Sequence, residues 1–572
     1  MSHVPERLLV WEIDYLPSLD MVQFSPITLP FPSPGTFTET LYLSTRTFST
    51  APDDTPPNQL YDGVILDPGT INHDVFASSG TSGRGTSNYG FIEIANVNGE
   101  FDFLYDASFG WPAYLKILGP DSLRIDEAMT LMQVVVIGIE SDDALRTLRF
   151  RIRDPMTVLD NPLLSERYAG TGGAEGGSAL TGRIKPLVLG RVSAVPAILI
   201  DDTNLIYQVS KSEVVYDTVR DGGLGLTQFD DVADYAALAA YAFIPPGNYV
   251  AASPVGMFRL SSAAAFEITV RCFGQISGSD YTAGSLIYEI LTEWMGIDPS
   301  EIDLTSIGTL IQWNNAFVGI YVNDERSAID VISYLADTVG GALIYSFRQG
   351  TGQFRTIFIY SPEGVLPSPP IFPGFDSPDY YGEILTYTLD NVVLSGFTLS
   401  LNVNTPASEG EGRPVWQVII KYGRIWHPLD IAGLAAAVAE SDSVNIFTTE
   451  WSEVSAYNLN LTGEFGLAAV FGLLPSAATI TYETAFDTAT GAQNEADRRI
   501  DIYGRRRDRL VVPFSFAEDP DFANHKLGDQ ILFSMSRFGY DTAYSPLEGK
   551  PFLVIGRKDD FKARVRTLTL WG

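Results

Sequence analysis

Residues 182–223, with the sequence GRIKPLVLGRVSAVPAILIDDTNLIYQVSKSEVVYDTVRDGG, decide the fold that we expect for this chain. The stretch contains three extended runs: 187–200, then 204–209 after a DDTN turn, and 214–216 before a DGG turn. β-Branched and aromatic residues fill these runs, which is typical of strands. Proline has no backbone donor, so Pro196 belongs at a strand start, an edge or a bulge. The stretch holds no pair of nucleophile and base and no cluster of metal ligands, and it therefore indicates a scaffold.

The composition favours several β-rich domains. A chain of 572 residues is too long for one hydrophobic core. Its 51 glycines, 34 prolines and short runs of Val, Ile, Thr, Tyr and Phe predict a mainly β chain with minor α and many turns. The net charge of −33 excludes a general binder of duplex DNA. Such charge would suit the wall of a conduit that DNA passes without sticking, and ordinary solubility explains it equally well.

Shifts in composition divide the chain into four expected domains. They are an N-terminal β domain with a first barrel (1–155), a β-rich insert domain with a glycine-rich loop (156–270), a mixed α/β domain (271–380) and a C-terminal domain with a second barrel (381–572). A flexible connector is expected at 77–90 and a proline-rich linker at 361–380. Helices are predicted at 230–241 with Asp230 or Asp231 as cap, at 285–296 with Ser285 as cap, and at 325–339, 429–440 and 491–504. Asn98-Gly99 predicts a hairpin turn between strands 90–97 and 100–105.

The loop at 165–182, SERYAGTGGAEGGSALTG, is rich in glycine and polar residues. We expect it to be either mobile or ordered by a partner. Its central glycines are candidate interface residues: Gly172, Gly173, Gly176 and Gly177.

Two distant segments resemble each other. Residues 135–151 read VVIGIESDDALRTLRFR, and residues 553–570 read LVIGRKDDFKARVRTLTL. Both contain an apolar strand, an Ile-Gly pair, a short acidic turn and a second strand that alternates with arginine. Strand–turn–strand patterns are common, so chance is one explanation. The other is that the chain contains two related β-barrel domains.

No motif for catalysis or cofactor binding is present. The chain lacks GxSxG, GxxxxGK[ST], GxGxxG and HExxH. Its four histidines (His3, His73, His427 and His525) are scattered, and Cys272 is the single cysteine, so we expect no metal, no disulfide and no cofactor. Pairs of aspartates fit turns and caps first, although sequence alone does not distinguish them from a glycosidase pair. We expect no enzyme, no signal peptide and no transmembrane span.

A basic cluster interrupts the acidic chain. It consists of Arg498, Arg499, Arg505, Arg506, Arg507 and Arg509. Nucleic-acid binding is one interpretation. The interpretation that we favour is an ion-paired face against an acidic neighbouring subunit, because arginine suits interfaces.

The order of several segments resembles one family along nearly the whole chain. These segments are TLYLSTRTFST (40–50), YDGVILDPG (61–69), FIEIANVNGEFDFL (91–104), RIRDP (151–155), NPLLSERYAG (161–170), GRIKPLVLGRVSAVPAILIDDTNLIYQVS (182–210), VVYD (214–217), PPGNYVAASPVGMFRL (245–260), VGIYVNDERSAIDVISYLADTVGGAL (318–343), NEADRRIDIYGRRR (494–507) and VIGRKDDFKARVRTLTLWG (554–572). The family is that of the tail-tip or baseplate hub proteins of long non-contractile-tailed phages, including Mu-like siphophages and relatives in gene transfer agents. No single motif is diagnostic, and their order carries the resemblance.

The resemblance implies a structural hub at the distal tip of a virion tail, made in the host cytoplasm. Such hubs are trimers with two related barrels in each subunit, so that a threefold protein presents a pseudo-sixfold ring to a hexameric tube. The implied partners are two further copies, the distal tail protein or tail-tube ring, a central fibre or receptor-binding protein, the tape-measure protein and, transiently, DNA. Some relatives carry an iron–sulfur cluster or a peptidase domain, which one cysteine and no catalytic motif do not support here.

Two alternatives stay open at this point. Tail-tip proteins are sometimes polysaccharide or cell-wall hydrolases. A receptor-binding adhesin is the other alternative, with exposed aromatic residues as sugar platforms; core packing is the ordinary use of such residues. The aromatic candidates are Trp111, Trp313, Trp426 and Trp451.

Overall fold

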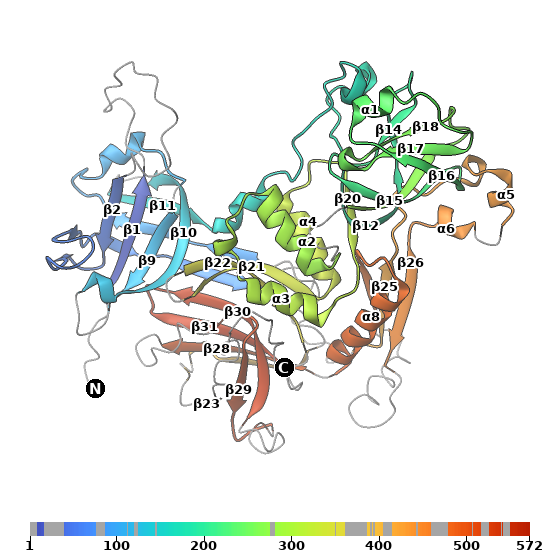
Figure 1. Ribbon diagram of the computed structural model, residues 1–572. Coiled ribbons are helices and arrows are strands. Elements are labelled where there is room, and N and C mark those ends of the chain that lie inside the picture. The colour runs from blue at the N-terminus through green and yellow to red at the C-terminus, as the bar shows by residue number, and fades with distance from the viewer. Residues whose placement is uncertain are drawn as a thin grey trace, which may run out of the picture.

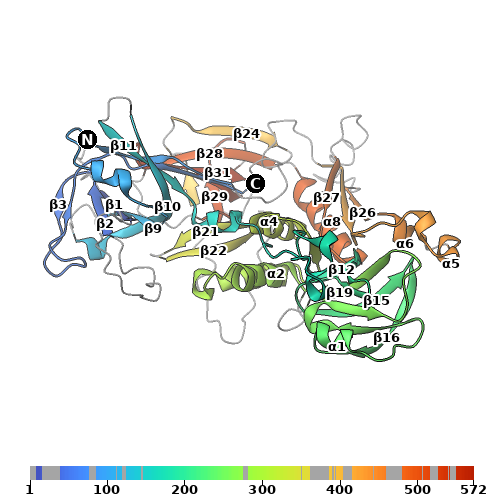
Figure 2. The same cartoon turned by 90° about the horizontal axis from the view of Figure 1, so that it is seen from above.

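The computed structural model describes residues 8–15, 39–75, 86–110, 112–118, 124–142, 146–274, 281–348, 351–360, 386–388, 392, 395–403, 415–441, 444–458, 479–505, 507–515, 526–538, 540 and 549–572. Within them the chain is mainly β, with few helices and several curled half-barrel sheets, which confirms the predicted fold class. Figures 1 and 2 show the N-terminal sheet (blue) at one end, a central sheet (green) at the other and helices between them, α2 (Ala283–Glu289) and α4 (Ala328–Thr338) among them. The division into four domains stays a prediction.

The N-terminal sheet has seven strands. They are β1 (Leu9–Tyr15), β2 (Glu39–Ser44), β5 (Ile65–Asp67), β8 (Phe91–Ala95), β9 (Pro112–Ile117), β10 (Met129–Ser141) and β11 (Thr147–Arg153), in the order β2-β1-β9-β10-β11-β8-β5. Two short strands, β3 (Phe48–Ser49) and β4 (Leu60–Tyr61), pair with each other. Side chains alternate between the two faces of a strand, and Trp11, Ile13, Ile92 and Ile94 accordingly enter one fully buried core.

The stretch 182–223 lies in the central sheet. Its strands are β12 (Leu187–Pro196), β13 (Ile198–Asp201), β14 (Ile206–Gln208), β15 (Val214–Asp221), β16 (Leu224–Asp231), β17 (Asn248–Ala252), β18 (Met257–Leu260), β19 (Ile268–Gly274) and β20 (Gly319–Val322), in the order β13-β14-β18-β17-β16-β15-β19-β12-β20. Pro196 ends β12, as its missing donor predicts. Gly190 has φ +70°, and a Cβ there would collide with the carbonyl oxygen of Val318, so glycine is required where β12 pairs with the start of β20.

Three helices pack together between the N-terminal and central sheets. They are α2 (Ala283–Glu289), α3 (Leu304–Trp313) and α4 (Ala328–Thr338). Helix α4 lies within the predicted 325–339; Ser327 caps it, and Gly340, with φ +69°, follows its end. The cap of α2 is Thr282, not Ser285, and a π-helical turn, Ile290–Trp294, continues the helix towards Gly296.

Other elements also differ from the predictions. Helix α1 (Tyr235–Ala239) is shorter than 230–241 because β16 extends through Asp231, and Asp234 is its cap. After Asn98-Gly99 the chain forms a 3₁₀ turn at 102–106 and no strand, since the Asn96 side chain accepts from Phe101 N (3.0 Å) and donates to Asp102 (2.8 Å). Helix α3 was not predicted because threonine and glycine weaken its pattern; Asp303 caps it by accepting from two backbone N–H groups, each at 3.1 Å.

The C-terminal sheet combines distant parts of the chain. Its strands are β23 (Thr386–Thr388), β24 (Thr398–Val403), β28 (Arg507–Ser515), β29 (Gln530–Ser534), β30 (Lys550–Asp560) and β31 (Val565–Trp571), in the order β23-β29-β30-β31-β28-β24. An early hairpin, β6 (Thr70–Asp74) and β7 (Thr86–Tyr89), joins this sheet because β6 pairs with β30. The linker at 361–380 and most of the connector at 77–90 lie outside the described residues.

Two smaller units complete the described chain. A hairpin is formed by β21 (Gly341–Arg348) and β22 (Thr351–Phe358). Helix α8 (Ala489–Tyr503), close to the predicted 491–504, packs on a three-stranded sheet of β25 (Gln417–Tyr422), β26 (Ser452–Tyr457) and β27 (Thr479–Glu483). The segment predicted as helix 429–440 contains a 3₁₀ turn (Ile431–Gly433) and the short α5 (Ala436–Ala439), and α6 (Asn445–Thr448) follows it.

Candidate functional site

One five-strand unit occurs twice in the chain. In chain order, β5, β8, β9, β10 and β11 correspond to β24, β28, β29, β30 and β31. The first set lies in its sheet as β9-β10-β11-β8-β5, and the second as β29-β30-β31-β28-β24. Every neighbouring pair in both sets is antiparallel. We call these units the first and the second half-barrel.

The two segments that resemble each other in sequence are equivalent hairpins. The pairs around the irregular position are Val136↔Ile152 and Gly138↔Arg151 in β10–β11, and Val554↔Leu570 and Gly556↔Thr569 in β30–β31. Each hairpin therefore has a β-bulge at the isoleucine of its Ile-Gly pair, Ile137 or Ile555. A shared register and a shared bulge favour duplication over chance as the source of the sequence similarity.

The half-barrels meet through an arm, which we define as the hairpin β6–β7. The arm belongs to the first half-barrel in sequence, yet β6 pairs with β30 of the second from Gly556↔Asp74 to Asp560↔Thr70. The amide of Val75 continues the ladder by donating to the carbonyl of Ile555 at 2.9 Å. The sequence gives no sign of this pairing, because residues far apart in the chain form it.

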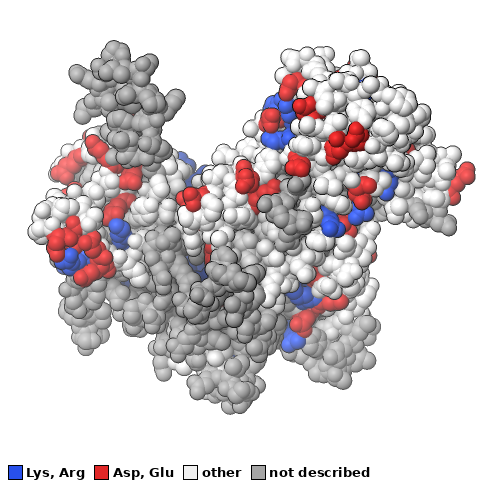
Figure 3. Space-filling model, viewed as in Figure 1, with Lys and Arg blue, Asp and Glu red and all other residues white. Residues whose placement is uncertain are grey.

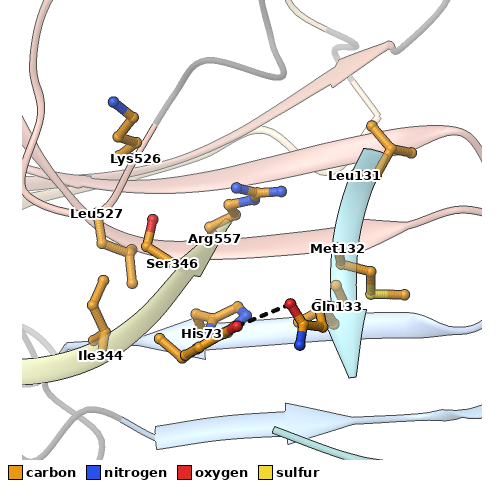
Figure 4. A pocket seen from close by; sticks show the side chains of 11 residues that line it. His73, Leu131, Met132, Gln133, Ile344, Ser346, Lys526, Leu527 and Arg557 are labelled. Carbon is orange, nitrogen blue, oxygen red and sulfur yellow. Dashed lines mark hydrogen bonds between the residues drawn. The ribbon is translucent and has the colours of Figure 1, made fainter. Parts of the chain in front are cut away.

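A small cavity of about 40 Å³ lies at this junction (Figure 4). β6 contributes His73, β10 contributes Gln133, β30 contributes Arg557, and the hydroxyl of Tyr345 on β21 donates to Gln133 at 3.0 Å. Burial, and secondly Arg557, lower the pKa of His73 to about 4. The volume suits a few water molecules, and no carboxylate is among the lining residues. The arrangement is typical of a packed junction between sheets and not of a substrate site.

Two of the predicted interface arginines form a buried clamp inside the chain. Arg498 and Arg499 both donate from Nε to the carboxylate of Glu495, each at 2.7 Å. Arg498 also donates to the carbonyl of Ile359 at 2.6 Å, and the Arg499 guanidinium lies over the ring of Tyr482. Burial alone would raise the pKa of Glu495, but the two arginines outweigh it and lower that pKa. The clamp joins α8 to neighbouring elements of the same chain.

The remaining arginines of the cluster do not share one surface. Arg505 pairs with Asp501 at 2.8 Å on the outer side of α8. Arg507 is fully buried and lies against the ring of Trp571, and Arg509 is partly buried on the same strand. Arg506 lies outside the described residues. The described members do not form one contiguous arginine face. The role of this set at a subunit interface stays a prediction.

The glycine-rich loop closes on itself. The amide of Gly172 donates to the carbonyl of Gly176 at 2.7 Å, and Lys185 pairs with Glu175 at 2.7 Å. Positive φ at Gly172, Gly173 and Gly176 makes this path possible. Contacts within the chain thus hold the loop, which the expectation of a mobile or partner-ordered loop did not foresee; ordering by a partner stays a prediction. Whether Gly172, Gly173, Gly176 and Gly177 also face a partner stays a prediction.

The described residues hold no group of three or more His, Cys, Asp or Glu arranged for a metal ion. His427 pairs with Glu267 at 2.5 Å, and His3 and His525 lie outside the described part of the chain. Cys272 is buried in the core of the central sheet, and burial raises the pKa of its thiol. None of the described helices is long and apolar enough to cross a membrane.

No protein-family model and no curated protein sequence matches the chain. Several solved structures are similar to it. The 43 kDa tail protein of prophage MuSo2 from Shewanella oneidensis shares 10% identity, with a TM-score of 0.34 over 90% of this chain and 94% of that one. A tail protein from Neisseria meningitidis MC58 shares 8% identity, with a TM-score of 0.34 over 88% and 91%. A chain of the virion of a native gene transfer agent particle shares 13% identity, with a TM-score of 0.39 over 71% and 87%.

These structural neighbours are phage tail proteins and a gene transfer agent component, the classes that the sequence resemblance names. With identities of at most 13% and TM-scores below 0.5, the likeness carries no argument about function. That argument rests on the residues of the chain itself.

Proposed function

We propose that this chain is a structural hub of a phage-type tail, located at the distal tip and present there in three copies. The observation that carries the proposal is the repeated half-barrel. Three chains, each with two equivalent units, offer six similar surfaces, which is how a threefold assembly can meet a sixfold tube. A chain with a single barrel could not match both symmetries in this way.

The proposed role is a joint and a conduit. The half-barrels would bind the distal tail protein or the tail-tube ring, and the central sheet and its helices would lead to a central fibre or receptor-binding protein. The lumen would pass the tape-measure protein and then DNA. The net charge of −33 suits such a passage, because a basic wall would hold the phosphate backbone.

The surface charge is consistent with this role. Figure 3 shows acidic and basic side chains of the described residues mixed together on the face in view, with no broad basic area. The described residues also form ion pairs that are partly exposed, such as Lys211–Glu166 (2.9 Å) and Arg424–Glu450 (2.9 Å). A surface of this kind supports contacts with protein more than retention of nucleic acid.

Electron microscopy of particles that carry the chain tests the proposal. The tail end would be averaged without imposed symmetry, and the chain would be located with an antibody or a fused tag. We expect threefold density that contains the chain directly below a sixfold tube. A chain that is absent from particles would overturn the proposal, and glycan hydrolysis by the purified chain would then favour the hydrolase alternative.

A further inference from the structure

The two half-barrels differ at one strand edge, and this difference points to a binding partner. In the second half-barrel, β30 has β31 on one side, and β29 and then β6 on the other. In the first, β10 has β11 on one side and β9 on the other, and the pairing with β9 ends at Val135. Among the described strands, none pairs with the outer edge of β10 from Gly138 to Ser141. This edge is the counterpart of the one that the arm covers on β30.

Solvent exposure shows the same difference. Ile555 is 2% exposed, whereas its counterpart Ile137 is 42% exposed. A Cβ added at Gly556 would lie 3.7 Å from the carbonyl oxygen of His73 in the arm, and a Cβ added at Gly138 would meet nothing within 4 Å. The first hairpin thus keeps the isoleucine, the bulge and the register, but within the described part of the chain no strand covers it.

The backbone of this edge is oriented for strand addition. The amide of Asp142 donates to Thr147 on β11 at 3.4 Å. Because successive residues of a strand present their backbone groups to opposite edges, Ile139 and Ser141 present theirs to the open edge. An edge with such groups pairs readily with a further strand.

We propose that a second copy of this chain covers this edge of β10 by adding a strand, as the arm covers β30 within the chain. The chain's own arm is already paired with β30 and no other described strand reaches this edge, so we assign the strand to another molecule. The duplication indicates which part of that molecule: the arm leaves its half-barrel between β5 and β8, and the corresponding connection in the second half-barrel lies between β24 and β28.

Each half-barrel would then contribute a strand to the neighbouring half-barrel. These contacts would alternate between pairs within one chain and pairs between two chains. Contacts of this head-to-tail kind generate a ring when the rotation closes. The inference deepens the proposed function and rests on it for the closed ring. Association through β10 can be measured on the purified chain, without the particle, so its failure is distinguishable from a failure of the proposed function.

The test compares the mass of the purified full chain with that of Ile137→Glu over a range of concentrations, by light scattering after size exclusion. Leu199→Glu is the matched control, because Leu199 is 40% exposed on β13 of the central sheet. We expect the wild type and the control to associate, and Ile137→Glu to associate at least about tenfold more weakly, since a buried, unpaired charge opposes docking. Unchanged circular dichroism would show that the variant folds.

A second comparison addresses the backbone. Ser141→Pro removes an outward amide, whereas Ser141→Ala removes only the hydroxyl, and we expect only the proline variant to weaken association. In the wild type, hydrogen exchange at Ile139 and Ser141 should slow as the concentration rises. A monomeric wild type at every concentration, or association that Ile137→Glu and Ser141→Pro leave unchanged, would overturn the inference. A hub found in particles would still stand in either case.

Discussion

Arg566 donates from Nε to Asp559 at 2.6 Å, and both side chains are buried within the β30–β31 hairpin. Arg557 adds a second charged hydrogen bond to the same carboxylate, from Nε at 2.8 Å. The equivalent positions in the first hairpin are the pair Ser141↔Leu148, so the two half-barrels share a backbone but not this ion cluster. The second hairpin, on which the arm packs, has the buried pair Asp559–Arg566. At the same positions the first hairpin has Ser141 and Leu148, which carry no charge.

Removing the carboxylate should destabilise the second half-barrel strongly. Asp559→Asn leaves two arginines without their shared anion, and breaking a buried pair typically costs about 3–5 kcal/mol. Urea unfolding measures the free energy, and Lys558→Ala, an exposed change on the same strand, is the control, with an expected effect within about 0.5 kcal/mol. Equal effects of the two changes would show that the cluster does not hold the hairpin.

The same carboxylate should make the hairpin sensitive to acid. Burial would raise the pKa of Asp559, but the two arginines outweigh it and hold that pKa well below its ordinary value. The stabilisation is therefore complete above the unfolded pKa of about 3.9 and is lost as the pH falls below it. We expect the stability of Asp559→Asn to fall less steeply with acid than that of the wild type, as followed by hydrogen exchange on β30 and β31.

The Arg498–Arg499–Glu495 clamp allows a comparison within one helix. Glu495→Gln leaves two arginines facing a neutral group in a buried site, and a loss of about 3–5 kcal/mol is expected in the opening free energy of α8. Asp501→Asn removes the exposed i,i+4 partner of Arg505, for which about 0.3–0.5 kcal/mol is typical. Native-state hydrogen exchange on α8 measures both. If the two variants are alike, the clamp is not what fastens the helix.

The sequence was most informative where contacts are local. The Ile-Gly pair and the acidic turn predicted equivalent hairpins, and the prediction of a helix at 325–339 found α4, although Ser327 was not foreseen as its cap. The arm on β30 could not be predicted, because no local pattern encodes pairing between residues 70–74 and 556–560. At α8 we proposed a partner subunit for Arg498 and Arg499 and overlooked Glu495 in the same helix, which stands three and four positions before them, at the spacing of intrahelical ion pairs.

The glycine-rich loop supplies another matched pair. Gly176 has φ +68°, and a Cβ there would lie 2.6 Å from Leu180 Cδ1, whereas a Cβ at Gly177 would meet nothing within 4 Å. Gly176→Ala should therefore open the loop at a cost of about 1–2 kcal/mol, and Gly177→Ala should have little effect. Trypsin cleavage after Arg167 and Arg183 reports this opening. Equal cleavage of the two variants would mean that the loop is not closed by its own contacts.

Glu289 should make stability depend on pH near neutrality. Burial raises its pKa to about 7, and its Oε2 atom is buried without a hydrogen-bond partner. Because the folded pKa lies above the unfolded one, the contribution of this group is complete below the unfolded value of about 4.3 and is lost as the pH rises through 7. We expect Glu289→Gln to be more stable than the wild type at about pH 8 and the difference to shrink towards about pH 5. Glu293→Gln, an exposed change on the same π-helical turn, is the comparison; because the Glu293 charge is only the smallest cause of the raised pKa of Glu289, this variant should keep most of the pH dependence of the wild type. Parallel curves for the wild type and Glu289→Gln, from thermal unfolding across this pH range, would show that Glu289 is ionised in the folded chain.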